Sequence, residues 1–189
     1  KRPTWPWVGV FLDDMLVPAR KFQVSSCTET WLLHQSAVSE THRVRLTKLT
    51  ENSKTFLGLS AFTAEGAFLP IRKQPRKRME IVGDSITCGY GNLVKDPDRH
   101  FFSADEDNWQ AYGPMAARKL GMEYSCISIS GITAVKHPGW HSAYAMCELY
   151  GYTDRVQQEK LNMAPQLWDF EKEHNDYVVV NLGTNDCYA

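Results

Sequence analysis

Three segments rich in apolar residues in the C-terminal part of the chain predict β-strands. They cover residues 79–82, 123–129 and 177–182, and a glycine follows each segment within two residues. Segments that are mainly apolar, without strict alternation, are typical of parallel strands that are covered on both faces. Between the first two runs, apolar residues recur at spacings of three and four from Trp109 to Leu120, which predicts a helix with Asn108 as its N-cap. Helical or partly helical structure is also expected at 143–152 and 161–173.

The N-terminal part has a different pattern, with short β-rich segments and no sustained helical period. Residues 8–12 form an apolar run, and residues 42–50 alternate between apolar and polar side chains. Such alternation is typical of a half-buried antiparallel strand. Residues 55–62 and 67–70 are expected to be the next strands. The pattern predicts part of a β-sandwich in residues 1–72, a basic linker in residues 73–78 and an α/β domain in residues 79–189.

Candidate chemistry follows the first of the parallel strands, where Gly83-Asp84-Ser85 interrupts the apolar run. These residue types favour turns on their own, so a simple turn is the alternative interpretation. The third apolar run ends in a similar way, at Gly183-Thr184-Asn185-Asp186. Open α/β sheets place their chemistry in the crevice outside the carboxyl ends of the strands. Two such ends predict one shared crevice, with Ser85 presented there as a nucleophile.

These two blocks resemble the first and third sequence blocks of the SGNH (GDSL-type) esterases and lipases. The longer run from Glu80 to Asn92 is most similar to carbohydrate esterase family 2, whose members remove acetyl groups from acetylated xylan, glucomannan and related sugars. Ser130-Gly131-Ile132 matches the second block in position and residue type. The resemblance covers about residues 42–189. It implies an α/β fold with an SGNH-type (flavodoxin-like) parallel sheet, preceded by part of a jelly-roll-like β-sandwich.

The resemblance also implies roles for individual residues. Ser85 is expected to be the catalytic nucleophile. The expected oxyanion hole consists of the backbone N–H groups of Ser85 and Gly131 and the side-chain amide of Asn185. Supporting turns are expected at Gly83, Asp84, Gly183 and Asp186. The implied reaction removes O-acetyl groups from plant-type polysaccharides through an acetyl-serine intermediate, without a metal or an organic cofactor.

The catalytic base has no counterpart in this sequence. The family's base is a histidine well downstream of the Gly-Thr-Asn-Asp block, and this sequence has no histidine after His174. His137 and His141 follow the second strand, so surface or packing roles are expected for them. The family's sheet has five strands in the order 2-1-3-4-5, and three of the five are found here. We therefore expect a second polypeptide or a continuation of the chain to complete the sheet and supply the histidine.

An alternative function belongs to a different class of protein. The chain would then be a non-catalytic, esterase-like subunit that serves as a structural or interaction module of a larger assembly. The absent histidine favours this alternative, whereas the retained Ser85, Gly131 and Asn185 favour the enzyme.

Composition narrows the range of partners. The net charge of −1 gives no reason to expect nucleic-acid binding, and the position and proline of the basic run at 72–78 favour a linker. The five cysteines are scattered, and no Cys or His spacing indicates a metal site.

The acidic residues at 105–107 are expected in a solvated loop. Packing is expected of Trp5, Trp7 and Trp31, rather than sugar stacking. No apolar run reaches transmembrane length, so no membrane partner is expected. The compartment is not determined by composition, and only the resemblance favours secretion.

Overall fold

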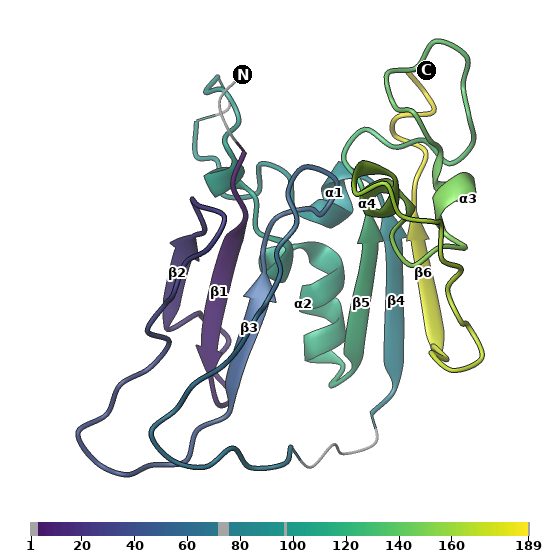
Figure 1. The fold of residues 1–189 in the computed structure, drawn as a ribbon. Coiled ribbons are helices and arrows are strands. Elements are labelled where there is room, and N and C mark those ends of the chain that lie inside the picture. Colours follow the sequence, from purple (N-terminus) through teal and green to yellow (C-terminus); the bar gives the residue numbers. More distant parts are fainter. Residues whose placement is uncertain (1–3, 72–75, 97, 189) are drawn as a thin grey trace.

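The computed structural model describes residues 4–71, 76–96 and 98–188, and it contains two three-stranded sheets (Figure 1). The antiparallel sheet has the strand order β2-β1-β3, and the parallel sheet has the order β5-β4-β6. The parallel sheet, with three strands and its first strand in the centre, confirms the predicted α/β fold class. Residues 72–75, which belong to the predicted basic run, lie outside the described residues, as do residues 1–3.

The antiparallel sheet is centred on β1 (Trp7–Leu12), which pairs with β2 (Arg20–Gln23) and β3 (Val44–Lys48). The strands predicted at 8–12 and 42–50 are confirmed in β1 and β3. β2 was not expected, because its sequence Arg-Lys-Phe-Gln has a single apolar side chain. The strands predicted at 55–62 and 67–70 are wrong, since both segments lack regular structure. Their apolar side chains are exposed, and β3 pairs with β1 alone among the described strands.

The parallel sheet consists of β4 (Arg78–Gly83) between β5 (Glu123–Ser128) and β6 (Tyr177–Asn181). The register pairs Gly83 at the end of β4 with Ser128 of β5 and Asn181 of β6. The three strands therefore end side by side, as the predicted shared crevice requires. β6 has one described partner, β4, and its Val178 and Val180 side chains are 51% and 63% exposed.

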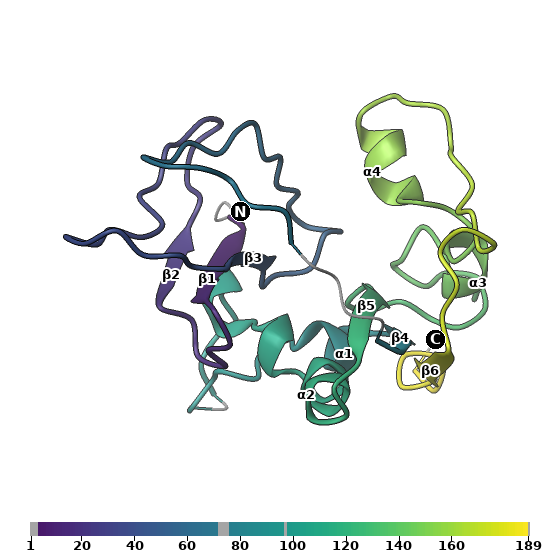
Figure 2. The same cartoon turned by 90° about the horizontal axis from the view of Figure 1, so that it is seen from below.

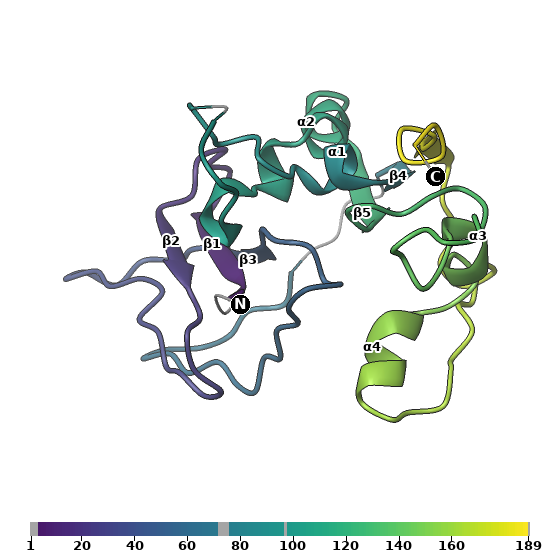
Figure 3. The ribbon, with the colours of Figure 1, turned by 90° about the horizontal axis from the view of Figure 1, so that it is seen from above.

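Short helices cover the two faces of the parallel sheet. Figures 2 and 3 show α1 (Ser85–Cys88) and α2 (Tyr112–Lys119) on one side, with α3 (Met146–Leu149) and α4 (Arg155–Lys160) on the other. Alternate residues of β4 point to these two sides, because Ile81 packs with Ala117 of α2 and Val82 packs with Met146 of α3. None of the described helices is long and apolar enough to span a membrane.

The helix predictions hold only in part. The helix predicted at 109–120 is present as α2 after a short 3-10 turn, η2 (Asn108–Gln110). Asn108 is not its N-cap, since Ala111 takes that position and the Asn108 amide donates to the Thr87 carbonyl. α3 lies within the predicted 143–152 segment. The helix predicted at 161–173 is wrong, because α4 precedes it and ends at Lys160, and Leu161, Met163 and Leu167 remain exposed.

Trp109 joins the antiparallel sheet to the α/β part. Its ring packs on Phe11 of β1 with a centroid separation of 4.3 Å, and both rings belong to a cluster with Leu49. The indole Nε1 donates to the Leu16 carbonyl at 2.7 Å, and the Arg118 guanidinium lies 3.8 Å from the ring centroid. Trp7 lies at the edge of the same cluster, which agrees with its expected packing role.

Replacing Trp109 by alanine is expected to lower the free energy of unfolding by about 3–5 kcal/mol. The indole is 3% exposed, so its removal would leave a cavity where the antiparallel sheet packs against the α/β part. Urea unfolding measures this change. Trp31→Ala is the control, since Trp31 stacks on Phe22 at a half-exposed position and is expected to lose less. Equal losses for the two variants would contradict a joining role for Trp109.

Candidate active site

Ser85 begins α1, directly after the sharp turn at the end of β4. Asp84 caps this helix, and its Oδ1 accepts the Ile86 N–H at 3.0 Å. A Cβ on Gly83 would lie 1.9 Å from Thr87 Oγ1 and 2.9 Å from the Asn181 carbonyl oxygen, so the turn has room only for glycine. Asp84 is buried, whereas Ser85 is half-buried. The structure thus turns the carboxylate inward and places Ser85 at the carboxyl end of the central strand.

The second block follows β5 at the same end of the sheet. Gly131 has a φ of +81°, a backbone conformation that favours glycine, and the exposed His141 side chain lies over it. The Gly131 carbonyl accepts the Trp140 Nε1–H at 2.8 Å. The preceding residue, Ser130, donates its backbone N–H to Glu51 Oε2 at 2.9 Å. This turn is therefore fixed from both sides.

The third block follows β6 and is bound to the second. Asn185 Nδ2 donates to the Ile132 carbonyl at 2.8 Å, one residue beyond Gly131. An amide NH₂ has two hydrogens, so one remains for a ligand in the crevice. Asp186 accepts the Ala134 N–H at 2.9 Å and lies 3.2 Å from His137 Nε2. These bonds, the Ala134 N–H first, hold the pKa of the Asp186 carboxyl below its usual value.

The described structure thus brings the predicted blocks to the ends of three adjacent strands. It gives no direct hydrogen bond between Ser85, Gly131 and Asn185, and Ser85 Oγ has no hydrogen-bond partner among the described residues. Neither His137 nor His141 bonds to Ser85 within the described parts. His137 instead pairs with Asp186, and the His141 ring lies 4.3 Å from the Trp140 ring. Both contacts fit the packing roles expected from the sequence.

Glu51, from the N-terminal part, was not connected to the site by sequence reasoning. Glu51 is 6% exposed, and its carboxylate accepts hydrogen bonds from the Ser130 N–H and from Ser53 Oγ and pairs with Lys54. No local signal in the sequence marks this contact, because Glu51 and Ser130 are 79 residues apart. The segment that follows β3 therefore contacts the turn that contains Gly131.

The expectation of a solvated acidic loop is wrong. Asp105, Glu106 and Asp107 are 5%, 1% and 2% exposed. Glu106 accepts the Glu51 backbone N–H, and Asp107 forms an ion pair with Lys21. Burial, and then the nearby Glu51 charge, raise the pKa of Glu106 to about 7. The loop is buried because partners distant in sequence cover it.

This raised pKa predicts a pH-dependent stability. The unfolded chain releases the Glu106 proton near pH 4.5 and the folded chain near pH 7, so the free energy of unfolding falls as pH rises through this window. This fall is expected to reach about 3 kcal/mol. Glu106→Gln should flatten the urea-unfolding profile between pH 4.5 and 7, whereas Glu65→Gln, at an exposed position, should leave it unchanged. A wild-type profile that rises across this window would contradict the prediction.

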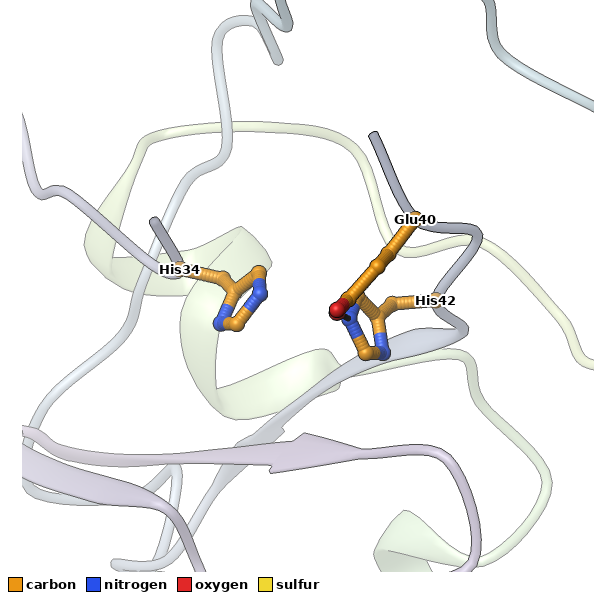
Figure 4. Close-up of side chains that lie close together, drawn as sticks. All are labelled: His34, Glu40 and His42. Carbon is orange, nitrogen blue, oxygen red and sulfur yellow. Dashed lines mark hydrogen bonds and ion pairs between the residues drawn. The ribbon is translucent and has the colours of Figure 1, made fainter. Parts of the chain in front are cut away.

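Side chains that could bind a metal ion lie away from the candidate active site. Among the described residues, one group of three His, Cys, Asp or Glu side chains is close enough to share an ion, and it contains His34, Glu40 and His42 (Figure 4). This group belongs to the loop between β2 and β3. The five cysteines are unpaired.

Comparisons with known proteins agree with this arrangement. Residues 79–189 match the GDSL-like Lipase/Acylhydrolase family. The chain is 31% identical over 183 residues to Cellulase/esterase CelE of Acetivibrio thermocellus, covering 95% of this chain and 21% of that protein. It is 33% identical over 150 residues to an Acetylxylan esterase / glucomannan deacetylase of Cellvibrio japonicus, covering 77% of this chain and 39% of the relative.

A solved family two carbohydrate esterase from Clostridium thermocellum has the same fold. It superposes with a TM-score of 0.81 at 30% identity, covering 97% of this chain and 54% of that one. The chain thus spans about half the length of the solved relative, and less of the two curated relatives.

The strand order, the Gly-Asp-Ser turn and the matched blocks define an SGNH-type hydrolase fold. This chain belongs to the GDSL-like lipase/acylhydrolase family, and its homologues and structural neighbours are family 2 carbohydrate esterases. The resemblance seen in the sequence is confirmed.

Proposed function

We propose that this chain carries the nucleophile and the oxyanion hole of a serine esterase that removes O-acetyl groups from carbohydrates. The observation that carries the proposal is Ser85 at the end of the central strand, with the Gly131 and Asn185 turns at the ends of its two neighbours. The names of the relatives support acetylated xylan and glucomannan as the substrate class. No metal or organic cofactor takes part in the proposed reaction.

The proposed reaction has two steps. Ser85 Oγ attacks the acetyl carbonyl carbon while a base takes the hydroxyl proton, and the carbonyl oxygen becomes an oxyanion. The N–H groups of Ser85 and Gly131 and the free amide hydrogen of Asn185 stabilise that charge. The C–O bond to the sugar then breaks, and the sugar oxygen receives the proton. Water hydrolyses the acetyl-Ser85 ester, which yields acetate and restores the serine. Gly83, Asp84, Gly183 and Asp186 hold the turns that position these groups.

The base and the outer strands are proposed to come from a continuation of the chain or from a second polypeptide. Two observations support this. Ser85 Oγ has no histidine partner among the described residues, and β6 presents exposed valines along an edge that no described strand covers. In the same proposal, residues 1–72 form the partial β-sandwich, 73–78 the basic linker and 79–189 the N-terminal part of the esterase domain.

Amide hydrogen exchange of the intact protein tests the covered edge. In β6, successive N–H groups point alternately toward β4 and toward the other edge. If another strand pairs there, the amides on both sides will exchange slowly. Fast exchange of the outward set in the intact protein would contradict the proposal.

Acetate release from acetylated xylan and glucomannan oligosaccharides tests the reaction. The intact protein is expected to release acetate as the sugar loses acetyl groups. The alternative, a non-catalytic subunit, is favoured by the unpartnered Ser85 Oγ of the described chain. If the folded, intact protein releases no more acetate than its Ser85→Ala variant, the chain is the non-catalytic subunit.

Glu51 is expected to support this activity from outside the crevice. In Glu51→Ala the Ser130 N–H loses its acceptor, and the adjacent Gly131 donor loses its fixed position. Small displacements of a catalytic group cost up to ~10²-fold, so kcat is expected to fall by about 10- to 100-fold. Glu51→Gln keeps an acceptor oxygen and should recover most of the rate. A Glu51→Ala variant with normal kcat would show that Glu51 serves stability alone.

A further inference from the structure

Two imidazoles and two carboxylates meet where the loop before β3 returns to the end of β1. His34, Glu40 and His42 come from the loop, and their ligand atoms lie within 4.8 Å of one another (Figure 4). Asp13 follows the end of β1. In Figure 1 the C-terminal end of β1 lies at the bottom of the view, whereas β4 leads into α1 at the top. The cluster is therefore separate from the candidate active site.

His42 is held in a fixed orientation by Asp13. His42 Nδ1 lies 2.9 Å from Asp13 Oδ2. Asp13 is itself fixed, because its Oδ1 accepts the Arg43 N–H at 2.9 Å and its own N–H donates to the Arg43 carbonyl at 2.7 Å. A carboxylate behind one ring nitrogen is the usual support of a metal-binding histidine. The other nitrogen, Nε2, then faces Glu40.

We propose that His34, Glu40 and His42 bind a divalent cation of the zinc class, with Asp13 orienting His42. Imidazole nitrogen and carboxylate oxygen are ligands that Zn²⁺ prefers, and three of them with water complete its four positions. His42 Nε2 and Glu40 Oε2 are 2.8 Å apart. Ligands around tetrahedral zinc lie about 3.3 Å from one another. The most distant pair of donor atoms must therefore close by about 1.5 Å, which exposed side chains can do by rotation.

An ion pair alone explains only part of this cluster. Asp13, and then Glu40, raise the pKa of His42, so its protonated form pairs well with both carboxylates. His34 takes no part in these ion pairs. Its ring lies 4.5 Å from the His42 ring at 71°, and no described residue hydrogen-bonds to it. A cation in place of the Nε2 proton would use all three donors and release that proton to water.

The bound cation would fix a long irregular segment. Residues 24–43 contain no helix or strand, and all three proposed ligands lie in this stretch, one in its middle and two near its end. Segments of this length without secondary structure are uncommon in compact domains. The ion would tie His34 and Glu40 to His42, which Asp13 holds against the end of β1. We expect the segment to become more ordered when zinc binds.

Isothermal titration of the intact, EDTA-treated protein with ZnCl₂ at pH 7.5 tests the site. His42→Gln and His34→Gln should each weaken one zinc equivalent at least tenfold, and Asp13→Asn should weaken it about 10- to 100-fold. His174→Gln, at an exposed histidine outside the cluster, should bind like the wild type. Zinc should also slow amide exchange in residues 24–43 of the wild type and of His174→Gln, and less so in the His34 and His42 variants. Binding that is absent, or unchanged in the His34 and His42 variants, would overturn the proposal.

Discussion

Replacing Ser85 by alanine is expected to abolish acetate release, with a fall in kcat of about 10⁶-fold. The acetyl-serine intermediate cannot form without Oγ, and the oxyanion donors alone retain only a small part of the rate enhancement. Stability should change little, because Ser85 is half-buried and its Oγ has no hydrogen-bond partner among the described residues. The measurement is acetate release by the intact protein together with its thermal unfolding.

Ser60→Ala is the matched control, since Ser60 is exposed and lies in a segment without regular structure. It should retain full activity and the wild-type melting temperature. If Ser85→Ala keeps more than about a tenth of the activity, another residue is the nucleophile and the assignment fails.

Asn185→Ala is expected to lower kcat by about 10²–10³-fold, because one oxyanion donor is lost. KM should change much less, since the donor acts on charge that develops only in the transition state. The variant also loses the hydrogen bond to the Ile132 carbonyl, which should cost about 1 kcal/mol of stability. Steady-state kinetics and urea unfolding separate these two effects.

Thr184→Ala is the control for this turn, because Thr184 is the exposed neighbour of Asn185. It should leave kcat within about twofold of the wild type. A normal kcat in Asn185→Ala, with reduced stability, would restrict Asn185 to a structural role at the end of β6.

The parallel sheet could be predicted because its strands are rich in apolar residues and lack strict apolar–polar alternation. The runs at 79–82, 123–129 and 177–182 became β4, β5 and β6, and their final glycines mark the turns. Local sequence is sufficient to predict these strands, since a mainly apolar run that ends near a glycine is typical of a strand in a small α/β domain.

The errors arose where structure depends on distant partners. Residues 55–62 have the composition of a strand, but no described strand pairs with them. The polar strand β2 forms because β1 offers it a backbone edge. The acidic loop is buried because Lys21 and Glu51 reach it from 86 and 55 residues away. None of these partners can be recognised from the segment itself.

We propose that Ser85 is an activated nucleophile whose base comes from beyond the described residues. Labelling the intact protein with a fluorophosphonate probe, followed by peptide mapping, shows whether Ser85 is activated. We expect one adduct, on Ser85, that is absent from Ser85→Ala and present in Ser60→Ala. A folded intact protein that gives no adduct on Ser85 would show that this serine is not activated, and would leave the non-catalytic subunit as the function of this chain.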